Sequence, residues 1–94
     1  MPAQTLRNLA RDPHEPVLLD LTPVRFAGHP LTIRLILRFA DDRVWRGRLQ
    51  FTDAASQITR ETAEIFCSAS EQDLWDSVRG LREHHFRDLY RSLE

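Results

Sequence analysis

The stretch Ser70–Leu93, SEQDLWDSVRGLREHHFRDLYRSL, decides the fold because its apolar residues recur at steps of three and four. That spacing places side chains on one face of an α-helix. Ser70 and Asp73 are typical of a helix start, where they satisfy free N–H groups and suit the helix dipole. The residues of this face are Leu74, Trp75, Val78, Leu81, His85, Phe86, Leu89, Tyr90 and Leu93. The stretch therefore predicts one long C-terminal helix.

Segments of alternating apolar and polar residues, typical of half-buried strands, precede this helix. They span residues 17–26, 31–40, 44–52 and 57–67. Ala27 to Pro30 are predicted to form a turn, and the short link at Asp41 and Asp42 predicts an antiparallel hairpin.

Two of the predicted strands contain an interruption. Pro23 cannot donate to a neighbouring strand, so the first strand is expected at an edge or with a bulge. In the fourth strand, Ile58 and Ile65 lie in opposite phase. A bulge near Glu61 or Thr62 would reconcile them.

The predicted fold class is α+β, with a four-stranded, meander-like antiparallel sheet and one long C-terminal helix packed on one face in two layers. A single ββββα domain is expected over residues 17–94. Residues 1–16 are predicted to form an N-terminal arm, either flexible or with a short helix around Ala3 to Arg11.

Composition agrees with one small domain. The 94 residues are 41% hydrophobic and 29% charged, and no apolar run is long enough to cross a bilayer. The first sixteen residues lack the apolar core of a signal peptide, and the single Cys67 cannot form an internal disulfide. We therefore expect a cytoplasmic protein without membrane contact.

The predicted sheet is wider than the predicted helix. Four strands span nearly 20 Å, whereas one helix covers a band of roughly 10 Å. Because a large exposed apolar face usually marks an interface, we expect a homodimer. The alternative is a monomer in which the N-terminal arm closes the sheet. The candidate interface residues are Trp75, Arg82, His85, Phe86 and Tyr90.

Two of these residues are polar within the apolar face of the helix. Arg82 is expected to form a structural ion pair, for instance with Glu64, with a ligand-binding role as the alternative. His85 is expected to be half-buried and bonded to the backbone, or else to form a pH-sensitive contact at a dimer interface.

Signatures of catalysis or metal binding are absent from the sequence. His84 and His85 are adjacent, so on a helix they point about 100° apart and cannot chelate one metal as an i, i+4 pair would. Cys67 would lie about 25 Å from them along the helix, too far for a nucleophilic pair. A Gly-rich phosphate loop and a nucleophile elbow are also missing. We therefore expect no enzyme, no cofactor and no metal.

All thirteen basic residues are arginine, a side chain suited to phosphate and carboxylate recognition. Alternation places Arg34, Arg38, Arg46 and Arg48 on the outer face of the sheet, with Arg25 or Arg60 at its margins. This face is a candidate nucleic-acid surface. The competing interpretation is a solvated face that Glu61 and Glu64 neutralise across the ladder.

The predicted order of four antiparallel strands and a C-terminal helix resembles small single-stranded nucleic-acid-binding modules such as Whirly and PUR-type domains. That resemblance implies a dimer that binds nucleic acid. Secretion chaperones and partner-binding domains share the same order. The leading hypothesis is a non-enzymatic dimeric interaction module, with a protein as a possible partner, and the alternative is single-stranded nucleic-acid binding through the arginine-rich face.

Overall fold

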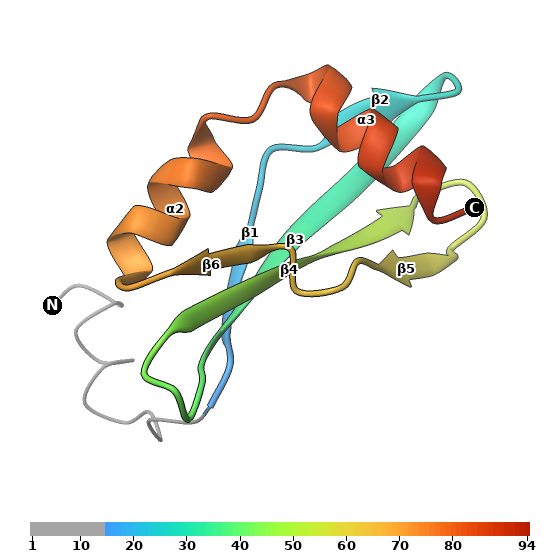
Figure 1. Cartoon of the computed structure of the whole chain (residues 1–94). Helices are drawn as coiled ribbons and strands as arrows, with labels where there is room; N and C mark the ends of the chain where they lie inside the picture. Colours follow the sequence, from blue (N-terminus) through green and yellow to red (C-terminus); the bar gives the residue numbers. More distant parts are fainter. Residues whose placement is uncertain (1–14) are drawn as a thin grey trace, which may run out of the picture.

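An open antiparallel sheet of six strands carries two short helices on one face in the computed structural model, which describes residues 15–94 (Figure 1). The strands are β1 (Val17–Asp20), β2 (Val24–Phe26), β3 (His29–Phe39), β4 (Trp45–Asp53), β5 (Thr59–Glu61) and β6 (Phe66–Ser68). The helices are α2 (Glu71–Arg79) and α3 (Glu83–Ser92). The α+β class with an antiparallel sheet is confirmed, whereas the prediction of four strands and one long helix is wrong in its number of elements.

The long hairpin of β3 and β4 forms the centre of the sheet, with Leu31 opposite Asp53 and Phe39 opposite Trp45. Its predicted alternation is confirmed, because Leu31, Leu35 and Leu49 are all buried on the helix side. The turn before β3 is shorter than predicted. Ala27 and Gly28 alone form it, both with positive φ, as two-residue hairpin turns often require.

A bulge at Pro23 divides the first predicted strand into β1 and β2, which both pair with β3 at the edge of the sheet. Asp20 pairs with Arg34 whereas Val24 pairs with Leu31, so the edge has one extra residue. A one-residue shift exchanges the faces of a strand. The odd-numbered apolar residues of β1 and the even-numbered ones of β2 therefore all face the helices.

The fourth predicted strand is divided as well. Gln50 pairs with Glu61 whereas Gly47 pairs with Phe66, so two extra residues lie between β5 and β6. The interruption falls where the opposite phases of Ile58 and Ile65 predicted a bulge. It buries neither side chain, since each of the two is 47% exposed.

The single long helix is corrected to two helices that meet at a junction, residues 80–82. Gly80 caps α2, and Arg82 has the extended backbone of an N-cap before α3. A continuous helix would have placed Arg82 in the buried stripe between Val78 and Phe86. The break leaves Arg82 exposed at the junction, which avoids burying an unpaired charge.

The two helices cover different parts of the sheet, α2 over β4 and β6 and α3 over β2 (Figure 1). Two helices that diverge at a break therefore cover more of the apolar face of the sheet than one straight helix would. The expectation of a half-open apolar face is wrong for this reason, because Leu35, Leu37, Leu49 and Phe51 are fully buried within one chain. The other buried members of this core are Val17, Val24, Leu31, Ile33, Leu74, Val78, Phe86 and Tyr90.

The arm predicted over residues 1–16 lies, up to residue 14, outside the described residues. In the part of the chain that the structure describes, neither helix is long and apolar enough to cross a membrane.

Candidate functional site

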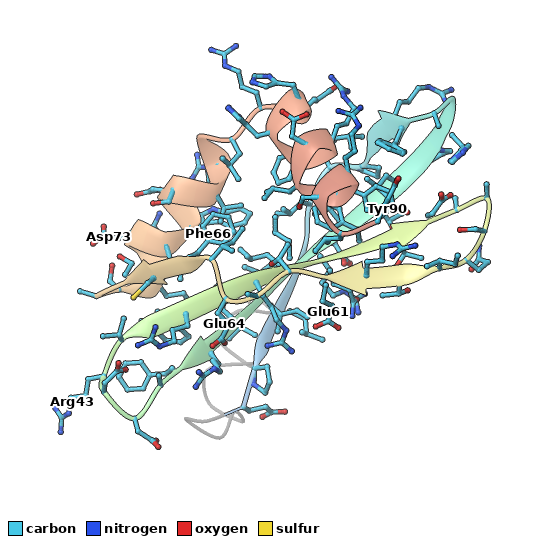
Figure 2. The ribbon with its side chains drawn as sticks, turned by 45° about the vertical axis from the view of Figure 1, so that its right-hand side comes forward. Arg43, Glu61, Glu64, Phe66, Asp73 and Tyr90 are labelled. Carbon is cyan, nitrogen blue, oxygen red and sulfur yellow. The ribbon has the colours of Figure 1, made fainter. Side chains whose placement is uncertain are left out.

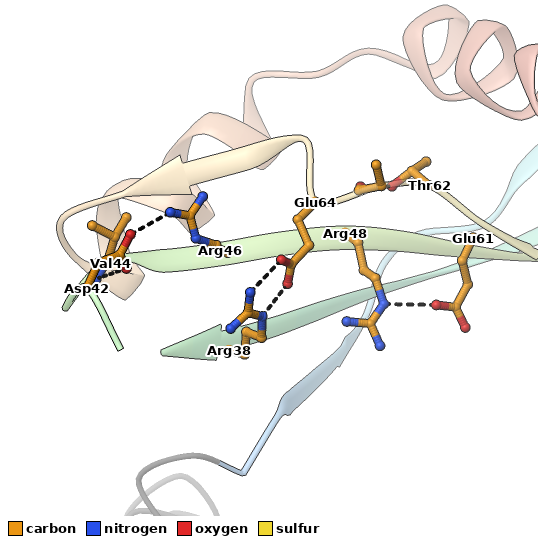
Figure 3. A network of polar contacts seen from close by, with 9 residues as sticks. Arg38, Asp42, Val44, Arg46, Arg48, Glu61, Thr62 and Glu64 are labelled. Atoms are coloured by element: carbon orange, nitrogen blue, oxygen red, sulfur yellow. Dashed lines mark hydrogen bonds and ion pairs between the residues drawn. The ribbon is translucent and has the colours of Figure 1, made fainter. Parts of the chain in front are cut away.

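The four arginines of the predicted nucleic-acid face do lie together on the outer face of β3 and β4, and each is paired with a carboxylate. Figure 3 shows the pairs of Arg38, Arg46 and Arg48. Figure 2 shows Glu61 and Glu64 on the side of the sheet away from the helices, and Phe66 and Tyr90 on the helix side. Alternation along the central hairpin thus predicted these positions correctly.

Arg38 makes the strongest pair. Its Nε and Nη2 donate to the two carboxylate oxygens of Glu64 at 2.6 and 2.8 Å. Glu64 belongs to the segment between β5 and β6, whose two extra residues bring this carboxylate to the outer face. These hydrogen bonds hold the pKa of Glu64 below its usual value, and they raise the pKa of Arg38.

The other three arginines have carboxylate partners of their own. Arg48 Nε donates to Glu61 at 2.8 Å, Arg46 Nη2 donates to Asp42 at 2.6 Å, and Arg34 Nε donates to Asp20 at 3.0 Å. Hydrogen bonds from Gln50 and then Arg48 lower the pKa of Glu61, and the bond from Arg46 lowers the pKa of Asp42. The face is therefore charge-balanced, as the neutralised interpretation expected.

Arg60 does not belong to this face. It lies opposite Phe51, which is buried under the helices, and its Nη1 donates to the carbonyl oxygen of Leu93 at 3.0 Å. A cation at the C-terminal end of a helix is stabilised by the helix dipole. Arg60 thus fastens the end of α3 to the edge of the sheet.

The five candidate interface residues separate into core and surface. Phe86 and Tyr90 lie in the core, Tyr90 with its ring centroid 5.0 Å from that of Phe26. Trp75 is half-buried, while Arg82 and His85 are exposed. The backbone N–H of Arg82 donates to His85 Nδ1 at 2.9 Å, so His85 caps α3. Arg82 forms no ion pair with Glu64, which is bound to Arg38.

Residues that could carry metal or thiol chemistry do not converge. Cys67 is a free, exposed thiol on β6 opposite Arg46, and it lies far in the chain from the adjacent rings of His84 and His85. Within residues 15–94, no group of three histidine, cysteine, aspartate or glutamate side chains could hold a metal ion.

Two mainly apolar hollows flank the helix junction, and Leu81 lines both. The edge hollow, about 410 Å³, lies between the β1–β2 connection (residues 20–24) and the helix side chains Trp75, Val78, Leu81 and Phe86, with Arg79 and Glu83 also in its lining. The α3 hollow, also about 410 Å³, is lined by Ile65, Phe66, Leu81 and Leu89, together with His85, Asp88 and Ser92.

A third hollow lies on the opposite face of the β1–β2 bulge. This outer hollow, about 400 Å³, shares Asp20, Leu21 and Pro23 with the edge hollow and has a polar lining that includes Thr32, Arg34, Gln50 and Thr52. None of the three hollows was predicted from the sequence. The sequence features that could have indicated them are Gly80 and Pro23. Gly80 breaks the helix and Pro23 interrupts the edge strand, and such breaks leave space that regular packing would fill.

Comparisons of the chain with protein-family models, curated proteins and solved structures found no match.

Proposed function

We propose that this chain is a non-enzymatic, dimeric interaction module in which the edge hollow beside the helix junction binds another polypeptide and the α3 hollow forms the contact between the two copies. The observation that carries the proposal is the size and lining of these hollows. Each is of the volume typical of binding pockets, and each is lined mainly by apolar side chains with a few charged ones. The proposed compartment is the cytoplasm, which suits the free thiol of Cys67.

Dimerisation forms the second part of the proposal, with the α3 hollow as its surface. Ile65 is 47% exposed, and Leu81 and Leu89 are half-buried beside it. Two copies related by a two-fold axis would cover these side chains mutually. Light scattering of the full chain is then expected to give twice the monomer mass of 11.0 kDa, and Ile65→Asp is expected to return it to the monomer.

Nucleic-acid binding, the alternative, has less support. Phosphates would have to displace a carboxylate from each arginine of the outer face, and the described face carries no aromatic platform on which bases could stack.

Selection of binders from a displayed library of random ten-residue peptides tests the polypeptide-binding proposal. Enriched peptides are expected to bind the native chain and to lose binding to Leu81→Asp, because that change places a charge in both hollows. Leu81→Ala is the matched control and should retain most of the affinity. The absence of any enriched peptide, or equal binding to Leu81→Asp, would contradict the proposal.

A further inference from the structure

The outer edge of β1 carries backbone groups that face away from the sheet. The N–H of Leu21 donates to the carbonyl of Ile33 at 2.9 Å, and Leu19 lies opposite Leu35 in the same register. Hydrogen-bonded and non-hydrogen-bonded pairs alternate in an antiparallel ladder. The N–H and C=O groups of Leu18 and Asp20 therefore point outward, where no described strand follows β1.

This free edge leads directly to the two hollows at the bulge. The edge hollow on the helix side and the outer hollow on the other side share Asp20, Leu21 and Pro23. Successive side chains of a strand point to opposite faces. A strand added beside β1 would thus direct alternate side chains toward an apolar hollow and a polar one.

We infer that the edge of β1 and the edge hollow together form a β-augmentation site. Its occupant is an extended segment of a partner protein with alternating apolar and polar side chains. Backbone hydrogen bonds to Leu18 and Asp20 bind the segment, and one large apolar side chain fills the edge hollow beside Trp75 and Phe86. This inference rests on the proposed function and specifies its partner.

The shortness of β1 argues against a second copy as the occupant. Four residues extend for only about 13 Å, and two strands of this length paired edge to edge would bury far less than the roughly 800 Å² per partner that a stable dimer buries. A second β1 also has no apolar anchor on the helix side, because Val17 is only 1% exposed in its own core and the exposed Leu18 (52%) lies on the outer face opposite Ile36.

Charge around the edge hollow fits an uncharged anchor. The three charged residues that line it each lie near an opposite charge of the same chain. Asp20 accepts from Arg34 at 3.0 Å, Glu83 accepts from Arg87 at 3.3 Å, and the Arg79 guanidinium lies 3.8 Å from Asp76. A charged anchor would have to disrupt these pairs, whereas an apolar side chain leaves them intact.

Leu18→Pro provides the sharpest test, because it removes an outward N–H that the sheet itself does not use. Proline is tolerated at such edge positions. Leu18→Ala is the matched control, since it shortens the side chain and keeps the N–H. A peptide enriched on the full chain from the random ten-residue library should alternate apolar and polar residues. Its affinity should fall about tenfold with Leu18→Pro and much less with Leu18→Ala.

Two measurements keep the inference testable if Leu18→Pro does not fold. The enriched peptide is made in two versions, with N-methyl groups on one or the other set of alternate backbone nitrogens. The version whose methyl groups face β1 should bind at least about tenfold more weakly, because it cannot complete the ladder, and the other version is the matched control. Amide hydrogens of Leu18 and Asp20 should exchange rapidly in the free chain and slowly in the complex.

Three results would overturn the inference. One is that both N-methylated versions bind as tightly as the unmodified peptide, and another is an enriched peptide that binds Leu18→Pro as tightly as the native chain. The third is slow exchange at Leu18 and Asp20 in the free chain, which would mean that residues 1–14 or a second copy already occupy the edge. A different result, the absence of any enriched peptide, would contradict the proposed function itself.

Discussion

Gly47 of β4 lies where leucine side chains of β3 and α2 approach the backbone closely. A Cβ built on Gly47 would lie 2.9 Å from Leu37 Cδ2 and 3.2 Å from Leu74 Cδ2. The missing side chain lets Leu74 of α2 pack directly on β4. The packing of Leu37 and Leu74 around Gly47 shows why a larger residue would not fit there.

Gly47→Ala is therefore expected to lower the free energy of unfolding by about 1–3 kcal/mol through overpacking. Urea unfolding measures the change. Gly80→Ala is the matched control, because Gly80 has a right-handed helical backbone and its added Cβ would make an ordinary contact with Ser77 O at 3.5 Å. A stability loss for Gly80→Ala equal to that of Gly47→Ala would contradict the overpacking explanation.

At the scale of elements, His85 caps the start of α3 at the junction between the two helices. It is the third residue of α3, a position at which Glu or Gln usually accepts the backbone N–H of the N-cap residue. His85 Nδ1 accepts the backbone N–H of Arg82 at 2.9 Å. The spacing of apolar residues placed His85 in the buried stripe, because that reading treated residues 70–93 as one helix. Gly80, an isolated glycine inside the helical pattern, is the sequence feature from which the break could have been predicted.

His85→Ala is expected to destabilise the domain by about 1 kcal/mol, the usual cost of losing a helix cap, and His85→Gln to restore most of that loss. Thermal unfolding at pH 8 measures both variants. His84→Ala is the control, since the neighbouring ring makes no cap. Equal losses for His84→Ala and His85→Ala would show that the cap does not stabilise the junction.

The outer face of the sheet makes stability depend on pH. The pKa values of Glu61 and Glu64 are lowered in the folded chain by hydrogen bonds from Gln50, Arg48 and Arg38. A carboxylate with a lowered pKa binds protons more tightly in the unfolded chain. Its stabilisation is complete above the ordinary glutamate pKa of about 4.3 and is lost as the pH falls through the folded-state value.

Chemical unfolding of the native chain should thus show nearly constant stability from pH 7 to about pH 5 and a decline below it. Glu64→Gln is expected to be less stable than the native chain at pH 7 and to lose less stability on acidification. The exchanged pair Arg38→Glu with Glu64→Arg should recover part of the stability at pH 7. An unchanged pH profile in Glu64→Gln would contradict the assigned role of this pair.

For the molecule as a whole, charge balance decides what the outer face can bind. The chain has a net charge of −1, and the four face arginines are matched by Asp20, Asp42, Glu61 and Glu64. Affinity for nucleic acid depends mainly on unpaired cations that replace counterions along the phosphate backbone. A balanced face supplies few of them.

The native chain is accordingly expected not to bind a fluorescent single-stranded DNA of twenty nucleotides in 20 mM salt. The double variant Glu61→Gln with Glu64→Gln should gain weak, salt-sensitive binding, because it releases Arg48 and Arg38. Fluorescence polarisation measures both. Salt-sensitive binding by the native chain would instead favour the nucleic-acid alternative.

The sequence by itself determined the elements whose causes are local. Alternation defined β3, β4 and the face of Arg34, Arg38, Arg46 and Arg48, and Pro23 located the bulge between β1 and β2. The phase of Ile58 against Ile65 indicated the place of the second interruption, but its reason was wrong, because neither side chain is buried there. These features depend on neighbours within a few residues, so they can be derived from spacing alone.

Only the tertiary structure decided how the apolar face is covered and which charges meet. Whether Gly80 bends or breaks a helix depends on what lies beneath it, and the pairing of Arg38 with Glu64 depends on the register between β4 and β6. Both outcomes minimise exposed apolar area and unpaired charge over residues distant in the chain. Such contacts form only when the sheet and helices have packed, and the same packing creates the hollow beside the edge of β1.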